Sequence, residues 1–295
     1  MKYTPAESRA GLLYGLAAYG FWGLMPLYFY ALEHVSAWEL LTQRIVWSAL
    51  LLAVLLTATR GWKKVIAAIR VPRTRRMLIA TAMLIAVNWC CYIIAATTGQ
   101  VVQASLGYFI APLVNTALGV LALGERLRRL QQVAIVLATI GVVLFAVMVG
   151  EFPGLALGLA LSFGIYGLFR KTVAADALTG LAVESAVLAP FALCYLIWLQ
   201  LHGGAKFGHV DREIDLLLMA GSVVTVTPLY CFAQAARRLR LTTIGFLQFL
   251  APTLQLAIAI TVGQEPFEPK KLVGFIFIWF AIIIYTRDTL RKQKC

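Results

Sequence analysis

A short apolar motif that occurs twice constrains the fold of this chain more than any other feature. The first copy reads SLGYFIAP at residues 105–112, and the second reads TIGFLQFLAP at residues 243–252. Each copy places a proline inside an apolar run, where the ring removes one backbone hydrogen bond and weakens a helix. Paired apolar segments interrupted by Gly and Pro are typical of the binding sites of membrane transporters. We therefore predict that Pro112 and Pro252 kink two cavity-lining helices.

The composition indicates that lipid surrounds most of the chain. Hydrophobic residues make up 61% of it and charged residues 13%, whereas soluble domains carry about 25% charged residues. Apolar runs of about 20 residues, enough to cross about 30 Å of hydrocarbon, occur ten times. The sequence predicts an all-α polytopic membrane protein with ten transmembrane helices. The predicted helices span residues 11–31, 38–59, 77–97, 101–123, 127–149, 154–169, 178–201, 214–236, 241–262 and 272–286.

The duplication extends beyond the proline motif. Gly20 and Gly23 in the first predicted helix match Gly164 and Gly167 in the sixth. Five helices per copy is an odd number, so the second copy must enter the membrane from the opposite face, as in inverted-repeat transporters. We predict a cytoplasmic N-terminus (1–10), a first five-helix repeat (11–149), an inverted second repeat (150–287) and a cytoplasmic basic tail (288–295).

The basic residues are distributed unevenly between alternate loops. Of the 26 Lys and Arg residues, those assigned to the far side are Lys206, Arg212, Lys270 and Lys271, and Arg44 lies inside a predicted helix. The remainder fall on one side, which includes both termini. Cytoplasmic loops carry an excess of Lys and Arg, so we expect a multi-pass protein of the cytoplasmic (inner) membrane with both termini in the cytoplasm.

Several motifs resemble those of one transporter family, the EamA-domain group of the drug/metabolite transporter superfamily, in its RarD subgroup. They are Ser105–Ile110 with Pro112–Asn115, Leu123–Arg126, Tyr166–Leu168 with Arg170–Lys171, Arg238–Leu241, and Gly245–Phe246 with Gln248 and Pro252–Thr253. The resemblance covers about residues 11–287. It implies a permease for small metabolites or drugs, and the RarD name is associated with chloramphenicol sensitivity.

Aromatic and amide side chains near the predicted midplane are the candidates for a substrate cavity. They are Tyr19, Trp22, Asn88, Trp89, Tyr92, Tyr108, Asn115, Tyr166, Gln248 and Gln255. A wall of aromatic rings and amides suits a neutral or zwitterionic, moderately apolar solute. For Asn88, Asn115 and Gln248 the alternative is hydrogen bonding between helices.

Ionisable groups inside a membrane are costly and mark functional positions by default. The sequence places three there, Glu39, Arg44 and Glu184. Arg44 either reaches the outer surface beside Glu39 or draws substrate into an outward-facing vestibule. Glu184 either carries a coupling proton or is bonded at a helix end to Arg170, Lys171 or the backbone. Because Arg44 and Glu184 lie in opposite halves of the membrane, we expect no direct contact between them.

Glu125 and Glu265 each follow a copy of the proline motif. Both stand beside a glycine that ends an apolar run. Their recurrence indicates a shared structural duty, such as fastening the end of the proline-containing helix to a neighbouring helix.

The best-supported function is a secondary transporter that works by alternating access, with a passive channel or a membrane sensor as the alternative. An enzyme is not expected, because His34, His202 and His209 lie in predicted outer loops and neither Gly-x-Ser-x-Gly nor His-Glu-x-x-His occurs. The five cysteines lack metal-ligand spacing, so no metal or cofactor is expected. The expected partners are the lipid bilayer and a small-molecule substrate, with protons and a homodimer left open and nucleic acid excluded.

Overall fold

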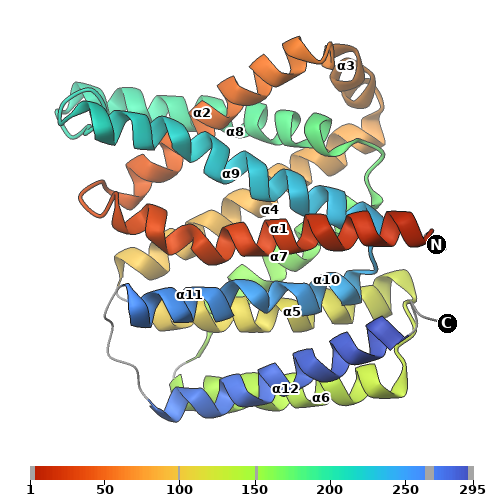
Figure 1. Ribbon diagram of the computed structural model, residues 1–295. Coiled ribbons are helices and arrows are strands. Elements are labelled where there is room, and N and C mark those ends of the chain that lie inside the picture. The colour runs from red at the N-terminus through yellow and green to blue at the C-terminus, as the bar shows by residue number, and fades with distance from the viewer. Residues whose placement is uncertain (1–3, 99, 150–151, 263–268, 292–295) are drawn as a thin grey trace.

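The computed structural model describes residues 4–98, 100–149, 152–262 and 269–291, and the regular secondary structure within these ranges is helical (Figure 1). The long helices are rich in apolar residues. Such segments are helical because a helix satisfies all its backbone hydrogen bonds internally when surrounded by lipid. The helices are α1 (Pro5–Tyr30), α2 (Ala37–Ala58), α3 (Trp62–Arg70), α4 (Pro72–Thr97), α5 (Val101–Leu123), α6 (Arg129–Val149), α7 (Gly154–Thr172), α8 (Ala177–Leu201), α9 (Arg212–Arg238), α10 (Leu241–Gln248), α11 (Leu250–Thr261) and α12 (Pro269–Arg291).

Each of the ten predicted segments coincides with helical structure, and the ninth is divided between α10 and α11. The short helix α3 was not predicted, because its nine residues, three of them basic, are too few to cross a bilayer. Among the described residues, eight helices are long and apolar enough to span a membrane, with α10 and α11 counted together. The helices α3, α7 and α12 are not among the eight.

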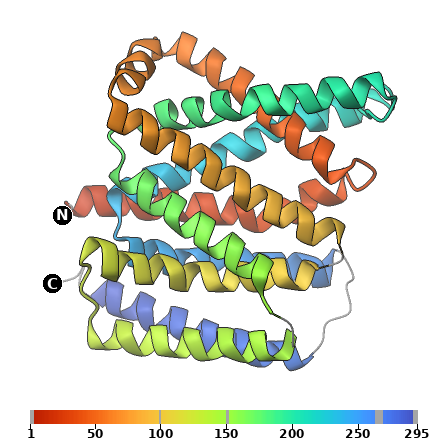
Figure 2. The same cartoon turned by 180° about the vertical axis from the view of Figure 1, so that it is seen from behind.

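The helices form a layered bundle. Helices α6 and α12 pair along one edge, α5 lies beside α10 and α11, and α2 and α8 pair along the opposite edge (Figure 1). Between these layers α1 packs against α9, and α4 crosses α7 on the back of the bundle (Figure 2). The start of α1 and the end of α12 lie together at one end, called here the termini end. The opposite end, where α1, α4 and α11 finish, is called the far end.

The two motif prolines have different local effects. Helix α5 continues through Pro112 from Val101 to Leu123. In the second copy the helix is interrupted at Phe249, whose N–H donates to Phe246 O at 3.4 Å. Pro252 therefore falls in the first turn of α11, where its missing N–H removes no helical bond. The interruption in the second copy lies beside the cavity described below.

Polar contacts tie the helices together at the termini end. Glu125, just past α5, accepts hydrogen bonds from the N–H groups of Leu241 at 2.7 Å and Thr242 at 3.0 Å. It thereby caps the N-terminus of α10, where a carboxylate is favoured by the helix dipole. Arg128 adds an ion pair with Asp288 of α12 at 2.9 Å. The expected fastening role of Glu125 is confirmed, and Glu265 lies outside the described residues.

Candidate substrate cavity

A cavity of about 550 Å³ occupies the half of the bundle toward the far end. Its walls come mainly from the second halves of α1 and α4, the first half of α5, Gln248 at the end of α10, and α11. Such a volume is within the range of about 300–1,000 Å³ that holds small molecules. The predicted cavity residues that line it are Tyr19, Trp22, Asn88, Trp89, Tyr92, Tyr108, Gln248 and Gln255, and Arg44 and Pro252 join them.

Aromatic rings form a large part of the cavity wall. Trp22 of α1 meets Phe163 of α7 edge-on, with ring centroids 5.5 Å apart. Tyr92 of α4 stacks on Phe29 at 6.1 Å and lies 6.3 Å from Tyr108 of α5. Sequence reasoning missed Phe29 because it stands near a helix end, where an aromatic ring is usually assigned to the membrane interface.

Three amides line the cavity and also join helices. Asn88 Nδ2 donates to Leu159 O of α7 at 2.9 Å. Gln255 Nε2 donates to Trp22 O at 3.0 Å, and this carbonyl lacks its helical partner because residue 26, four positions on, is a proline. Gln248 Oε1 accepts from Asn115 Nδ2 at 2.6 Å. The amides therefore fix the geometry of the wall while facing the cavity.

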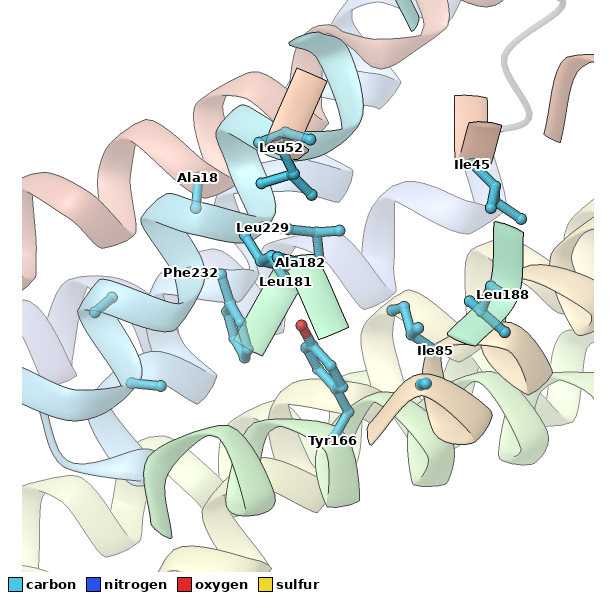
Figure 3. Close-up of a cluster of buried hydrophobic side chains, with 14 of the residues drawn as sticks. Ala18, Ile45, Leu52, Ile85, Tyr166, Leu181, Ala182, Leu188, Leu229 and Phe232 are labelled. Atoms are coloured by element: carbon cyan, nitrogen blue, oxygen red, sulfur yellow. The ribbon is translucent and has the colours of Figure 1, made fainter. Parts of the chain in front are cut away.

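Asn115 and Tyr166 do not line the cavity. Asn115 is fully buried at the contact between α5 and α10, where it serves the alternative role of an interhelical hydrogen bond. Tyr166 points from α7 toward Leu181 and Ala182 of α8 (Figure 3). Its ring stacks on Phe232 at 5.9 Å, and its hydroxyl donates to Glu184 Oε2 at 3.2 Å. Both side chains pack between helices, Asn115 between α5 and α10 and Tyr166 against α8 and α9.

Arg44 lies in the cavity wall rather than at the outer surface. It is 8% exposed, and its Nε donates to Thr225 Oγ1 of α9 at 2.8 Å. Its guanidinium carbon lies 5.8 Å from the ring of Phe29 and 5.9 Å from that of Trp89. Stacking against rings is a favourable setting for a guanidinium. The position fits the vestibule interpretation of Arg44.

Glu39 does not serve as the partner of Arg44. Its Oε1 accepts hydrogen bonds from the backbone N–H groups of Lys206 at 2.8 Å and Phe207 at 3.0 Å. These two residues belong to the connection between α8 and α9. Glu39 is fully buried, and it holds this connection against the start of α2.

Glu184 is paired with Arg170, which lies just past the predicted helix of residues 154–169 and was therefore expected in a loop. Arg170 is helical and 1% exposed, and its Nη1 lies 3.4 Å from Glu184 Oε1. Arg170 Nη2 also donates to Ala177 O at 3.1 Å. The loop assignment of Arg170 was wrong, because α7 extends three residues past the predicted end. The alternative in which Glu184 is bonded to Arg170 is confirmed, and no ion pair joins Glu184 to Arg44 in the described part of the chain.

Comparison with known proteins places the chain in one family. The EamA-like transporter family matches it twice, over residues 9–147 and 153–287. An "Uncharacterized transporter" of Vibrio cholerae is 44% identical over 293 residues, which cover 99% of this chain and 97% of that protein. Protein RarD of Escherichia coli is 42% identical over 288 residues, covering 98% of this chain and 97% of that protein. These matches confirm the resemblance inferred from the motifs.

Two further comparisons agree. A "Chloramphenicol-sensitive protein RarD" of Pseudomonas aeruginosa is 31% identical, with 97% of each chain covered. One solved crystal structure covers 96% of this chain and 98% of its own with a TM-score of 0.73 at 18% identity, which shows a shared fold alone. The names of the family and of these relatives are those of transporters rather than enzymes. This chain is therefore a multi-pass inner-membrane transporter that belongs to the EamA-like transporter family, among relatives named RarD.

Proposed function

We propose that the protein is a secondary carrier that moves a small neutral or zwitterionic metabolite or drug-like solute across the cytoplasmic membrane by alternating access. The observation that carries this proposal is the cavity of about 550 Å³ at the far end. The termini end of the same bundle is tied together by Glu125, by Arg128 with Asp288 and by Arg170 with Glu184. A cavity near one end and a closed opposite end are the features of one of the two states that such a carrier needs.

Helix packing supports ten membrane-crossing helices in two inverted repeats, 11–149 and 150–287. A two-fold axis in the membrane plane exchanges α1 with α7, α2 with α8, α4 with α9, α5 with α10 and α11, and α6 with α12. Under this exchange the contact of α1 with α9 becomes that of α7 with α4, and the contact of α1 with α11 becomes that of α7 with α5. Both members of each pair are present.

The distribution of Lys and Arg supports cytoplasmic termini, which makes the cavity outward-facing. We expect cysteines introduced singly at Arg70 and Lys206, in a cysteine-free background, to react with impermeant maleimide from opposite sides of the membrane. Residue 206 should be labelled in intact cells, and residue 70 only after the cells are opened. Labelling of both positions from the same side would contradict the inverted arrangement.

Transport itself can be tested with purified protein in liposomes. We expect saturable uptake of labelled L-phenylalanine or chloramphenicol that is accelerated when the same solute is present inside, because a carrier exchanges faster than it returns empty. Protein-free liposomes are the control. Ohmic single-channel current without counterflow would instead support the passive-channel alternative, and an absence of exchange for both solutes would count against a carrier for these two solute classes.

A further inference from the structure

Arg44 is the one charged residue among the described residues that line the cavity. Its Nε is bonded to Thr225 Oγ1, whereas its two Nη nitrogens make no hydrogen bond to any described residue and are not sealed from the cavity. A cation in a membrane interior is costly unless a counter-charge or acceptor faces it. The described cavity wall contains no carboxylate.

The internal repeat shows how unusual this arrangement is within the molecule. Glu184 follows Arg44 by 140 residues, the same offset that separates Pro252 from Pro112, so the two are repeat equivalents. Glu184 is neutralised by Arg170 at 3.4 Å. The register that matches Gly23 to Gly167 places Pro26 at the position corresponding to Arg170. Pro26 lines the cavity and carries no charge. The second repeat therefore pairs its buried charge within the protein, and the first repeat leaves its charge facing the cavity.

We propose that Arg44 binds a carboxylate of the transported solute, whose apolar part lies against the rings of Trp22, Tyr92 and Tyr108. This inference rests on the proposed carrier function and narrows it. Among the solutes proposed above, it favours zwitterions over neutral molecules. It also adds monoanionic acids as a solute class. The guanidinium is already oriented for this task by Thr225 and by the rings of Phe29 and Trp89.

The donor set favours a carboxylate over a phosphate. With Nε engaged, the two Nη groups can meet the two oxygens of a carboxylate. A phosphate would bring further charged oxygens, which need further donors. The described cavity wall holds no cation besides Arg44 to balance their charge, and Asn88 Nδ2 already donates to Leu159 O and Ser162 Oγ.

The test compares two probes that differ in charge and hardly in size, 3-phenylpropanoate and 3-phenylpropanamide. Binding to the purified full-length protein is followed by fluorescence, because Trp22 and Trp89 line the cavity. A hydrogen-bonded charge pair corresponds to about a tenfold or greater change in affinity, so we expect the wild type to bind the acid about tenfold or more tightly than the amide. Arg44→Gln should abolish this preference while amide binding remains.

Lys206→Gln is the matched control, because it removes one exposed positive charge at the far end without touching the cavity. Its preference for the acid should equal that of the wild type. Thr225→Val is a second variant in case Arg44→Gln fails to fold. It removes the acceptor that orients the guanidinium and should reduce the preference several-fold.

Three results would overturn the inference. They are equal binding of acid and amide by the wild type, no binding of either probe, and an acid preference that survives both Arg44→Gln and Thr225→Val. None of these outcomes affects the carrier proposal, which is decided separately by counterflow. Counterflow of chloramphenicol without acid preference would leave a carrier whose solute does not use Arg44, whereas acid binding without counterflow would leave a binding site without carrier function.

Discussion

Replacement of Glu184 by leucine is expected to destabilise the fold by about 3–5 kcal/mol, the range found when one partner of a buried ion pair is removed. The remaining Arg170 is 1% exposed and would keep Ala177 O as its bonded acceptor among the described residues. An arginine stays protonated in proteins, so it cannot escape the cost by losing its charge. Equilibrium unfolding of the purified protein, followed by tryptophan fluorescence, measures the change.

The companion variants separate loss of pairing from loss of packing. Arg170→Met should cost less than Glu184→Leu, because a buried glutamate can take up a proton. The double variant should be more stable than Glu184→Leu alone, since it leaves no unpaired charge. If the double variant is as unstable as the sum of the single variants, the pairing argument is wrong.

An exposed pair supplies the control for Glu184→Leu. Lys64 lies 3.6 Å from Asp176, with the two side chains 73% and 43% exposed. Lys64→Met should change the unfolding free energy by about 0–1 kcal/mol, because solvent screens such a pair. A loss as large as that of Glu184→Leu would show that breaking an exposed ion pair is as costly as breaking the buried one, and that burial does not account for the effect.

Replacement of Gly245 by valine is expected to cost about 1–3 kcal/mol or more by overpacking the crossing of α10 and α5. A Cβ at position 245 would lie 2.6 Å from Pro112 O and 2.9 Å from Thr116 Oγ1. The first contact is with backbone, so α5 itself would have to move. This close approach explains why the second copy of the motif carries a glycine at this position.

The same substitution should also disturb the cavity. Gln248 follows Gly245 by about one helical turn, lines the cavity and accepts the 2.6 Å hydrogen bond from Asn115 of α5. Separation of α10 from α5 would lengthen this bond, and we expect solute binding to fall together with the unfolding temperature. The readouts are thermal unfolding and fluorescence titration with 3-phenylpropanoate.

Gly20→Ala is the control for the Gly245 variant, because a Cβ at position 20 would meet no atom within 4 Å. Alanine is favoured over glycine inside a helix by about 1 kcal/mol, so Gly20→Ala should leave stability unchanged or raise it. Equal losses at positions 20 and 245 would indicate that helix flexibility, rather than the close crossing, accounts for the effect.

Much of the candidate site could be predicted because its signals lie within single helices. Eight of the ten predicted cavity residues line the cavity, since aromatic and amide groups near the midplane of an apolar helix have few other places to lie. For Asn88 and Gln248 the sequence left cavity lining and interhelical hydrogen bonding as alternatives, and each side chain does both. Gln255 has the same double role. That double role depends on which carbonyl lies opposite, such as the Trp22 carbonyl freed by Pro26.

The sequence by itself determined the helical segments, the duplication and the family, because apolar length and repeated motifs are properties of the chain read in one dimension. The tertiary structure alone decided which charges are paired. Arg170 stands among basic residues assigned to a loop but meets Glu184 inside the bundle, and Arg44 meets Thr225 and two rings rather than Glu39. The physical reason is that hydropathy specifies how deep a residue lies, whereas its partner depends on which helix faces pack together.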